Sequence, residues 1–210
     1  MSYAVKEMFL TLQGEGRHAG RRAVFVRFSG CNLWSGREQD RAGALCRFCD
    51  TDFVGMDGDG GGRFADAGAL AGAAAALWGG DRAGAYVVLT GGEPLLQVDP
   101  PLIAALHGAG FTIAVETNGT IAAPDGLDWI CVSPKAGNAV VQRSGDELKL
   151  VWPQPGSDIE AMEGWDFRHF LIQPMDCADA DAARDAAIAL VMARPKWRLS
   201  VQAHKLLGLR

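Results

Sequence analysis

The stretch AVFVRFSGC, residues 23–31, combines a predicted strand with a cysteine that closely follows it. The β-branched and aromatic residues of 23–28 predict the strand, and a polar turn follows it. The same pattern recurs downstream at 86–89, 112–115, 127–132, 148–151, 169–172 and 198–201. Alanine-rich stretches predict helices between several of these strands, at 64–78, 100–109 and 178–193. This alternation indicates an α/β fold with a parallel sheet and helices outside it.

The length of the chain limits how far such a sheet can close. About six strand–helix units are too few for an eight-unit barrel, so we expect an incomplete (β/α) barrel with about six parallel strands. Ligands should bind at the carboxyl ends of these strands. Residues 1–210 are expected to form a single domain with an insert between Cys31 and Cys46. The glycine-rich segment 57–62 predicts a flexible loop without chemistry of its own.

Three cysteines, Cys31, Cys46 and Cys49, are the strongest chemical signal. Fourteen residues separate the first two, and the last two form a Cys-x-x-Cys pair. Such a pair directs two sulfurs to one side of a tight loop, which suits a metal or an iron–sulfur cluster. Three thiolates would leave one iron of a four-iron cluster open to a substrate or a cofactor. The cysteines therefore favour a reaction centre over a simple electron carrier.

Zinc is the main alternative to a cluster. A structural zinc site needs four ligands, and a second Cys-x-x-Cys or His-x-x-x-His pair is missing from the sequence. His18 could be a fourth ligand, but it lies among charged loop residues. Buried inert thiols are a third reading.

Disulfides are not expected, because the five cysteines are an odd number and the N-terminus MSYAVKEMF lacks a basic-then-apolar leader. Reduced cysteines fit a cytoplasmic location. The net charge of −5 argues against nonspecific nucleic-acid binding, and the short apolar runs argue against a membrane span.

Several motifs together resemble a known enzyme family. TGGE at 90–93 and ETNG at 116–119 follow predicted strands, as they do in the radical S-adenosylmethionine superfamily. That superfamily usually has three residues in the first cysteine gap, so the long gap here is a departure. The motifs LQGEG at 12–16, VSPK at 132–135, QPM at 173–175 and QAHK at 202–205 narrow the resemblance to the 7-carboxy-7-deazaguanine synthases.

The resemblance implies a lyase that uses a 4Fe-4S cluster, S-adenosylmethionine and Mg²⁺. It would convert 6-carboxy-5,6,7,8-tetrahydropterin into 7-carboxy-7-deazaguanine with loss of ammonia, in queuosine and deazapurine biosynthesis. It further implies a homodimer and an electron donor such as flavodoxin or ferredoxin. The hydrogen abstraction would use a radical from the cofactor, so no catalytic general acid or base is expected.

The family's cofactor-binding positions match residues at several strand ends. The resemblance assigns S-adenosylmethionine to Phe48, Cys49, Asp50, Gly92, Glu93, Glu116, Ser133, Pro134, Lys135, Gln173, Pro174, Met175 and Asp176. From the residues alone, Glu93 could pair with the methionine ammonium or cap the next helix. Glu116 could bind a ribose diol or form a salt bridge, and Lys135 could equally lie at the surface. Gly91 and Gly92 would let the backbone approach a ligand, or form a plain turn.

The substrate needs a cation at its carboxylate and acceptors at its pyrimidinone edge. Arg27 offers two parallel donors for the carboxylate if it points inward, and it would otherwise lie on the outer face of the sheet. The other expected contacts are Leu12, Gln13, Gly14, Glu15, Thr90, His204 and Arg210. Arg210 would act through a terminal carboxylate in the barrel mouth, unless the chain end is frayed. The resemblance makes Thr51 the protein ligand of Mg²⁺, which prefers oxygen ligands and usually keeps several waters.

Two other functions share part of this pattern. A glycyl-radical activating enzyme has the same cysteine and Gly-Gly-Glu elements but docks a partner protein. A non-enzymatic iron–sulfur or zinc protein would need a fourth ligand. The motifs at 12–16 and 202–205 favour an enclosed small-molecule site over both.

Overall fold

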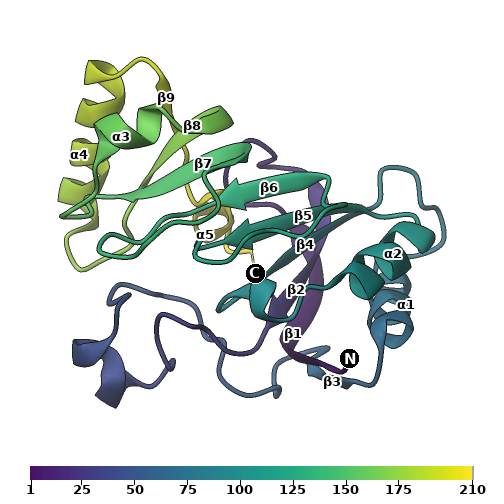
Figure 1. Cartoon of the computed structure of the whole chain (residues 1–210). Helices are drawn as coiled ribbons and strands as arrows, with labels where there is room; N and C mark the ends of the chain where they lie inside the picture. Colours follow the sequence, from purple (N-terminus) through teal and green to yellow (C-terminus); the bar gives the residue numbers. More distant parts are fainter. Residues whose placement is uncertain (210) are drawn as a thin grey trace.

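Nine strands form one continuous sheet in the computed structural model, which describes residues 1–209 (Figure 1). Their order across the sheet is β3-β1-β2-β4-β5-β6-β7-β8-β9. Every neighbouring pair from β2 to β9 is parallel, whereas β1 is antiparallel to both β2 and β3. The strands are β1 Tyr3–Leu12, β2 Arg22–Phe28, β3 Gly62–Phe64, β4 Tyr86–Gly91, β5 Thr112–Thr117, β6 Trp129–Val132, β7 Ser144–Trp152, β8 Asp166–Pro174 and β9 Trp197–Leu199.

The helices cover the outer face of this sheet in two groups. α1 and α2 lie over the β1–β5 half, and α3 and α4 lie over the β6–β9 half (Figure 1). Their bounds are α1 Ala67–Trp78, α2 Pro100–Gly108, α3 Ile159–Glu163, α4 Ala180–Ala193 and α5 Ala203–Leu207, with short 3-10 helices η1 Glu38–Gly43 and η2 Pro94–Leu96. Asp66, Asp99 and Asp179 begin the three longest helices, and each accepts a backbone N–H of the first turn.

Side-chain alternation along each strand separates the core from the site. On β2, Val24, Val26 and Phe28 are fully buried beneath α1 and α2. The residues between them, such as Phe25 and Arg27, point to the inner face. The outer positions therefore build the main core, whereas the inner face carries a smaller apolar cluster around Phe25 and the polar side chains of the site.

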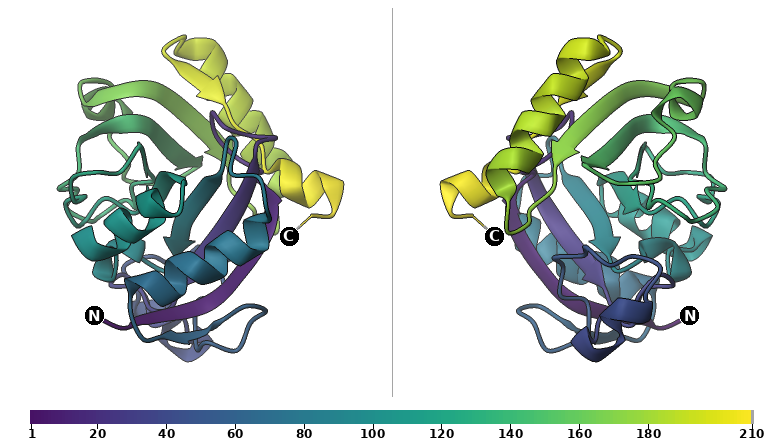
Figure 2. Two further views of the ribbon diagram at one scale, coloured as in Figure 1. Left: turned by 90° about the vertical axis from the view of Figure 1, so that its right-hand side faces the viewer. Right: turned by 90° about the vertical axis from the view of Figure 1, so that its left-hand side faces the viewer.

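The sheet stays open, which confirms the expected incomplete barrel. Figure 2 shows the yellow C-terminal helix α5 beside the purple strand β1, at the rim where the sheet does not close. The backbone N–H of Ala203 donates to the carbonyl of Gly14 at 2.8 Å, so the last segment is attached to the turn after β1.

The predicted strands all exist, and the parallel run has seven of them, β2 and β4 to β9. The antiparallel strand β1 is not predicted, because Lys6 and Glu7 interrupt its apolar alternation. The register explains the interruption: Val5 is opposite Phe28, and Glu7 is already opposite Arg27. Lys6 is therefore the extra residue of a β-bulge.

Segment 57–62 is largely a loop, as predicted, but its backbone is hydrogen-bonded to β1. The N–H of Met8 donates to the carbonyl of Asp59 at 2.8 Å, and the N–H of Gly58 donates to the carbonyl of Lys6 at 3.0 Å. A Cβ at Gly60 or Gly61 would collide with the carbonyl oxygen of Met8 or Lys6. The glycines thus let the segment lie directly on the exposed edge of β1, which continues the edge that β3 covers.

Candidate active site

A cavity of about 400 Å³ opens at the carboxyl ends of the parallel strands. Its wall comes from the inner face of β1, β2, β4, β5, β7 and β8, the cysteine-containing loop after β2, and the start of α5. Most of the predicted site residues line it together: Leu12, Gln13, Gly14, Glu15, Arg27, Phe48, Cys49, Asp50, Thr51, Thr90, Gly92, Glu116, Ser133, Lys135, Gln173, Pro174, Met175, Asp176 and His204. The parallel topology is what brings residues so distant in sequence to one edge.

The insert between Cys31 and Cys46 folds over the aromatic ring of Trp34. The guanidinium of Arg41 lies 4.1 Å from the centre of this ring, and Phe53 meets the ring edge-to-face at 5.6 Å. Arg41 also donates from Nη1 to the carbonyls of Arg47 and Cys49, at 3.0 and 3.1 Å. The insert therefore fixes the backbone of the Cys-x-x-Cys turn.

The three thiols lie in one electrostatic neighbourhood. Burial raises the pKa of Cys31 and of Cys46, and the Cys49 thiol acts on both. No group of three or more His, Cys, Asp or Glu side chains in the described part of the chain converges on a single metal ion. Cys49 lines the cavity, whereas Cys31 and Cys46 do not.

Lys135 is a cation that acts on the thiols of this loop. Burial lowers its pKa, while the thiols of Cys46 and Cys49 act in the opposite direction. Its ammonium donates to the carbonyl and the hydroxyl of Ser133 at 2.9 and 2.8 Å, and lies 5.8 Å from the centre of the Phe48 ring. Lys135 is therefore part of the cavity wall and does not lie at the outer surface.

The two glycines of the Gly-Gly-Glu segment pack closely against the chain that leads into the cysteine-containing loop. A Cβ at Gly91 would collide with the backbone of Phe28, and one at Gly92 with Gly30 and Cys31. The two glycines thus let β4 approach the cysteine-containing loop.

Glu93 is fully buried and is not part of the cavity lining. Its carboxylate accepts from the N–H of Leu95 at 3.0 Å, the hydroxyl of Thr117 at 2.8 Å and the N–H of Asn118 at 2.8 Å. It caps η2 and joins β4 to the end of β5, which is the structural alternative that the sequence left open. Pro134 also lies behind the lining, where its carbonyl accepts from the amide of Gln154 at 3.3 Å.

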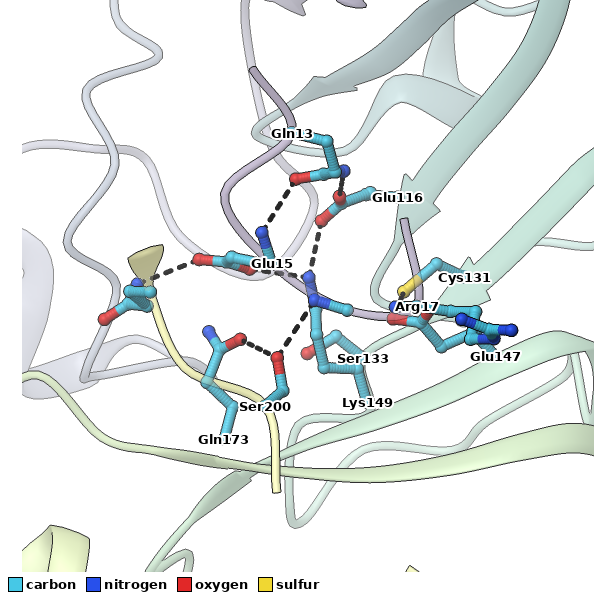
Figure 3. A network of polar contacts seen from close by, with 12 residues as sticks. Gln13, Glu15, Arg17, Glu116, Cys131, Ser133, Glu147, Lys149, Gln173 and Ser200 are labelled. Carbon is cyan, nitrogen blue, oxygen red and sulfur yellow. Dashed lines mark hydrogen bonds and ion pairs between the residues drawn. The ribbon is translucent and has the colours of Figure 1, made fainter. Parts of the chain in front are cut away.

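A network of buried charges forms the floor of the cavity (Figure 3). The ammonium of Lys149 is 2.6 Å from Glu15 Oε2 and 2.9 Å from Glu116 Oε2. Gln13 donates to the other oxygen of Glu116 at 2.8 Å, and Gln202 to the other oxygen of Glu15 at 2.9 Å. Glu116 therefore has the salt bridge that the sequence allowed, on the inner face of the sheet.

Arg27 lies on the cavity wall, where its Nε donates to Glu7 Oε1 at 2.8 Å. Thr90 is its neighbour on β4. At the mouth, Lys205 of α5 bridges Asp50 and Asp176, at 2.8 and 2.5 Å. This bridge ties α5 to the cysteine-containing loop and to the segment after β8. Arg210 lies outside the described residues.

The cavity residues without a predicted role include Lys6, Lys149, Gln202 and Lys205, of which the last two belong to the motif at 202–205. Lys6 binds Asp52 and Asp57 at 2.8 and 2.7 Å, so it holds the end of the cysteine-containing loop to β1. Lys149 had a detectable signal, because a lysine between Leu148 and Leu150 on a predicted strand must point to the opposite face from its apolar neighbours. Lys6 is the bulge residue of β1, and Gln202 and Lys205 belong to the short helix α5 and its N-cap, where no apolar periodicity marks them.

An open, mostly parallel sheet with a cysteine-containing loop and a cavity at its carboxyl ends defines an α/β enzyme with the radical S-adenosylmethionine fold. The crystal structure of QueE from Escherichia coli has this fold too: it superposes with a TM-score of 0.71 at 29% identity, over 97% of this chain and 95% of that one. No family model matches the chain.

The chain is 63% identical to the 7-carboxy-7-deazaguanine synthase of Bradyrhizobium diazoefficiens, and 63% identical to that of Caulobacter vibrioides. The match covers 100% of both proteins in each case. The chain is also 55% identical to the synthase of Nitratidesulfovibrio vulgaris, over the full length of both proteins. The chain belongs to the 7-carboxy-7-deazaguanine synthase family, and is thus an enzyme of deazapurine biosynthesis. Membership disfavours both a glycyl-radical activating enzyme and a non-enzymatic metal protein.

No helix of residues 1–209 has the length and apolar character needed to cross a membrane.

Proposed function

We propose that this enzyme converts 6-carboxy-5,6,7,8-tetrahydropterin into 7-carboxy-7-deazaguanine and ammonia, with a 4Fe-4S cluster, S-adenosylmethionine and Mg²⁺ as cofactors. The observation that supports this proposal is that one cavity is lined both by Cys49 and by the residues expected to bind the pterin. The substrate contains the same atoms as the product plus ammonia, so the reaction is a rearrangement with no net oxidation. A reaction of this kind depends more on a radical that starts it and on a rigid, enclosed active site than on general acids and bases.

The three cysteines fit a cluster better than a single ion. In a 4Fe-4S cluster each thiolate binds a different iron, so the sulfurs need not converge on one point. Cys31, Cys46 and Cys49 would hold it, with Arg41 fixing the turn that carries the last two. When bound, the cluster and S-adenosylmethionine supply an organic radical that removes one hydrogen atom from the substrate. The protein's own residues must then position that atom and exclude water.

The S-adenosylmethionine side of the cavity is assigned to the strand ends nearest the cysteines. Phe48, Asp50, Gly92, Ser133, Lys135 and the segment 173–176 line this side. The carbonyl of Gly92 suits an ammonium group, and the Ser133 hydroxyl suits a ribose or carboxylate oxygen. Glu116 has one oxygen toward Lys149 and one toward Gln13, and can accept a diol hydroxyl on the remaining lone pairs. Glu93 and Pro134 would act indirectly, through the loops that they support.

The pterin side is assigned to β1, β2 and the turn after β1. Arg27 can offer its terminal N–H groups to the substrate carboxylate, because its Nε is the atom that binds Glu7. Gln13 and Glu15 offer acceptors to the N–H edge of the pyrimidinone ring. Gly14 lies against the ring of His204, so α5 would cover this end of the ligand. Thr90 and the backbone of Leu12 complete the wall.

Thr51 would be the protein ligand of Mg²⁺. Its hydroxyl lies in the cavity lining, 3.5 Å from Asp50 Oδ1. One hydroxyl is a weak site by itself, so substrate oxygens and waters would complete the coordination. The metal would then align the substrate carboxylate.

Three wider proposals accompany this function. The enzyme forms a homodimer, receives electrons from a small donor protein such as flavodoxin or ferredoxin, and works in the cytoplasm. All five cysteines are free, which fits a reducing compartment.

Anaerobic reconstitution with iron and sulfide tests the function directly. The reduced enzyme, given S-adenosylmethionine, Mg²⁺ and 6-carboxy-tetrahydropterin, should form 7-carboxy-7-deazaguanine and ammonia in equal amounts. An intact, reducible cluster that cleaves no S-adenosylmethionine and forms no deazapurine would overturn the proposal.

A further inference from the structure

The ammonium of Lys149 is the most deeply placed charge in the cavity. Its side chain is 4% exposed, and it projects from the middle of β7 while Leu148 and Leu150 enter the apolar core on the other face. A buried ammonium needs anionic partners, because its desolvation is costly. Lys149 has two, Glu15 at 2.6 Å and Glu116 at 2.9 Å. These belong to separate elements, the turn after β1 and the end of β5.

The two carboxylates and the ammonium are part of a closed ring of contacts (Figure 3). Gln13 donates from its side chain to Glu116 at 2.8 Å, and its side-chain oxygen accepts from the backbone N–H of Glu15 at 3.1 Å. Lys149 completes the ring between the two carboxylates. Gln202 holds Glu15 from outside the ring at 2.9 Å. Neither carboxylate can turn without breaking a contact to Lys149 or to a glutamine.

The charge of Lys149 helps to keep Glu15 ionised. Burial raises the pKa of Glu15, but the nearby Lys149 ammonium, together with hydrogen bonds from Gln202 and Gln173, outweighs burial and holds this pKa well below its usual range. Burial lowers the pKa of Lys149, and Glu116 and Glu15 more than compensate. The other ionisable groups that act on Lys149 and its surroundings are Cys131 on β6, Glu147 on β7 and the more distant Lys135. Acidic groups are thus in excess here, and Lys149 is their central counter-ion.

We propose that Lys149 is a positioning residue shared by both ligands of the cavity: it fixes Glu15 to accept from the N–H edge of the heterocyclic substrate and Glu116 to accept from a hydroxyl of the nucleoside cofactor. The assignment of the ligands rests on the function proposed above. The position and the ionisation of the two carboxylates do not, since they are properties of the protein alone. Lys149 selects ligands that donate hydrogen bonds at both places, because an ionised carboxylate can only accept.

Carboxyl-carbon NMR of the cluster-free protein, labelled at glutamate Cδ, tests the ionisation. Glu15→Gln and Glu116→Gln assign the two signals. In the wild type the Glu15 signal should remain at the carboxylate position from about pH 8 down to about pH 5, because the usual pKa of a glutamate is about 4.3 and Lys149 lowers that of Glu15. In Lys149→Met, the Glu15 signal should show protonation with a midpoint above about pH 5, because a buried carboxylate that has lost its cation resists ionisation.

Lys205→Met is the matched control for the loss of a lysine. Lys205 pairs with Asp50 and Asp176 at the mouth of the same cavity. Its substitution should therefore leave the NMR signals of Glu15 and Glu116 unchanged. If Lys149→Met also leaves both signals as in the wild type, the proposal is overturned. Its failure differs from failure of the proposed function, since this measurement involves no cluster, cofactor or turnover.

Ligand binding tests the positioning. Dissociation constants are measured anaerobically by equilibrium dialysis, for S-adenosylmethionine and for 6-carboxy-tetrahydropterin, with unreduced cluster-loaded enzyme. Lys149→Met should raise the dissociation constants of both ligands by roughly tenfold or more. In a Glu15→Gln background, Lys149→Met should no longer weaken pterin binding, because the effects of substitutions at residues in contact are not additive.

Lys149→Arg keeps the charge and serves if Lys149→Met does not fold. Its larger planar group should displace the carboxylates, so both ligands bind more weakly while the Glu15 NMR signal stays at the carboxylate position. Wild-type dissociation constants for both ligands in Lys149→Arg would contradict the positioning role.

Discussion

Arg27 and Glu7 face each other across the antiparallel pair β1–β2, with Arg27 Nε 2.8 Å from Glu7 Oε1 at the cavity wall. Both side chains are mostly buried, 19% and 17% exposed. The pair holds the guanidinium by its Nε. A lysine could reach Glu7 or a ligand, but has no planar fork to bind both.

Arg27→Lys should therefore weaken binding of 6-carboxy-tetrahydropterin by about a hundredfold, since breaking a buried charged pair costs on the order of 3 kcal/mol. S-Adenosylmethionine binding should change much less. Anaerobic binding isotherms measure both, with Glu7→Gln as the control that loosens the arginine without removing it. Wild-type affinity for the pterin in Arg27→Lys would place the substrate carboxylate elsewhere.

Three of the five cysteines are expected to bind the cluster, and the other two are not. Cys31→Ala, Cys46→Ala and Cys49→Ala should each abolish cluster assembly, because the loss of one thiolate leaves only two protein ligands. Cys177→Ala is the matched control at an exposed thiol, and Cys131→Ala the control at a buried one. Iron and sulfide content after reconstitution gives the result. A full cluster in Cys46→Ala would refute the ligand assignment.

Arg41 should determine how firmly the cluster is held. Arg41→Lys cannot keep both carbonyl contacts, at Arg47 and Cys49, together with the stacking on Trp34. Charged hydrogen bonds are worth roughly 1.5–3 kcal/mol, so the cluster should be lost to a chelator about tenfold faster. Arg47→Lys is the control, because that exposed arginine makes one long contact to Ala44 at 3.3 Å. Equal loss rates in the two variants would mean that Arg41 does not stabilise the turn.

Glu93 should contribute more to the stability of the fold than to the binding of S-adenosylmethionine. In Glu93→Gln, an amide nitrogen replaces one acceptor oxygen and faces a donor N–H or O–H, which costs about 2 kcal/mol of unfolding free energy. Urea unfolding of the cluster-free protein measures this loss, and Thr117→Val removes one of the three donors as a milder comparison. Unchanged stability together with lost S-adenosylmethionine binding would instead make Glu93 a direct ligand contact.

Acid should destabilise the protein partly through Glu15. Its pKa is held near 2 in the folded state, because Lys149 and the hydrogen bonds of Gln202 and Gln173 outweigh burial, and is about 4.3 when unfolded. This stabilisation is therefore complete above about pH 4.3 and is lost as the pH falls toward 2. The unfolding free energy of Glu15→Gln should vary less between about pH 4.5 and 3 than that of the wild type. Identical slopes would show that Glu15 is not ionised by Lys149 as described.

The sequence predicted those parts of the molecule that depend on local pattern. The strand segments follow from short apolar runs and the three longest helices from alanine-rich stretches, although about six parallel strands were expected and seven form. The polar strand ends meet at one cavity because parallel strands share an edge. Partners that are distant in sequence could not be predicted. The contacts of Glu93 with Thr117 and of Lys149 with Glu15 join different elements, and no local pattern records which acceptor a buried side chain will meet. The attachment of the glycine-rich segment could not be predicted for the same reason, since its partner is the edge of β1.

The bulge at Lys6 gives β1 a place where the chain can lose a residue without turning side chains over. Removing Lys6 would restore regular pairing while Val5 stays opposite Phe28, so Tyr3 and Val5 would remain on the outer face. A deletion in the regular part of the strand, between Glu7 and Leu12, would instead move the side chains before it to the opposite face, because strand side chains alternate with period 2. When distant relatives are aligned, a one-residue gap in β1 is therefore expected at position 6, and a gap elsewhere in the strand would signal a misalignment before it signalled divergence.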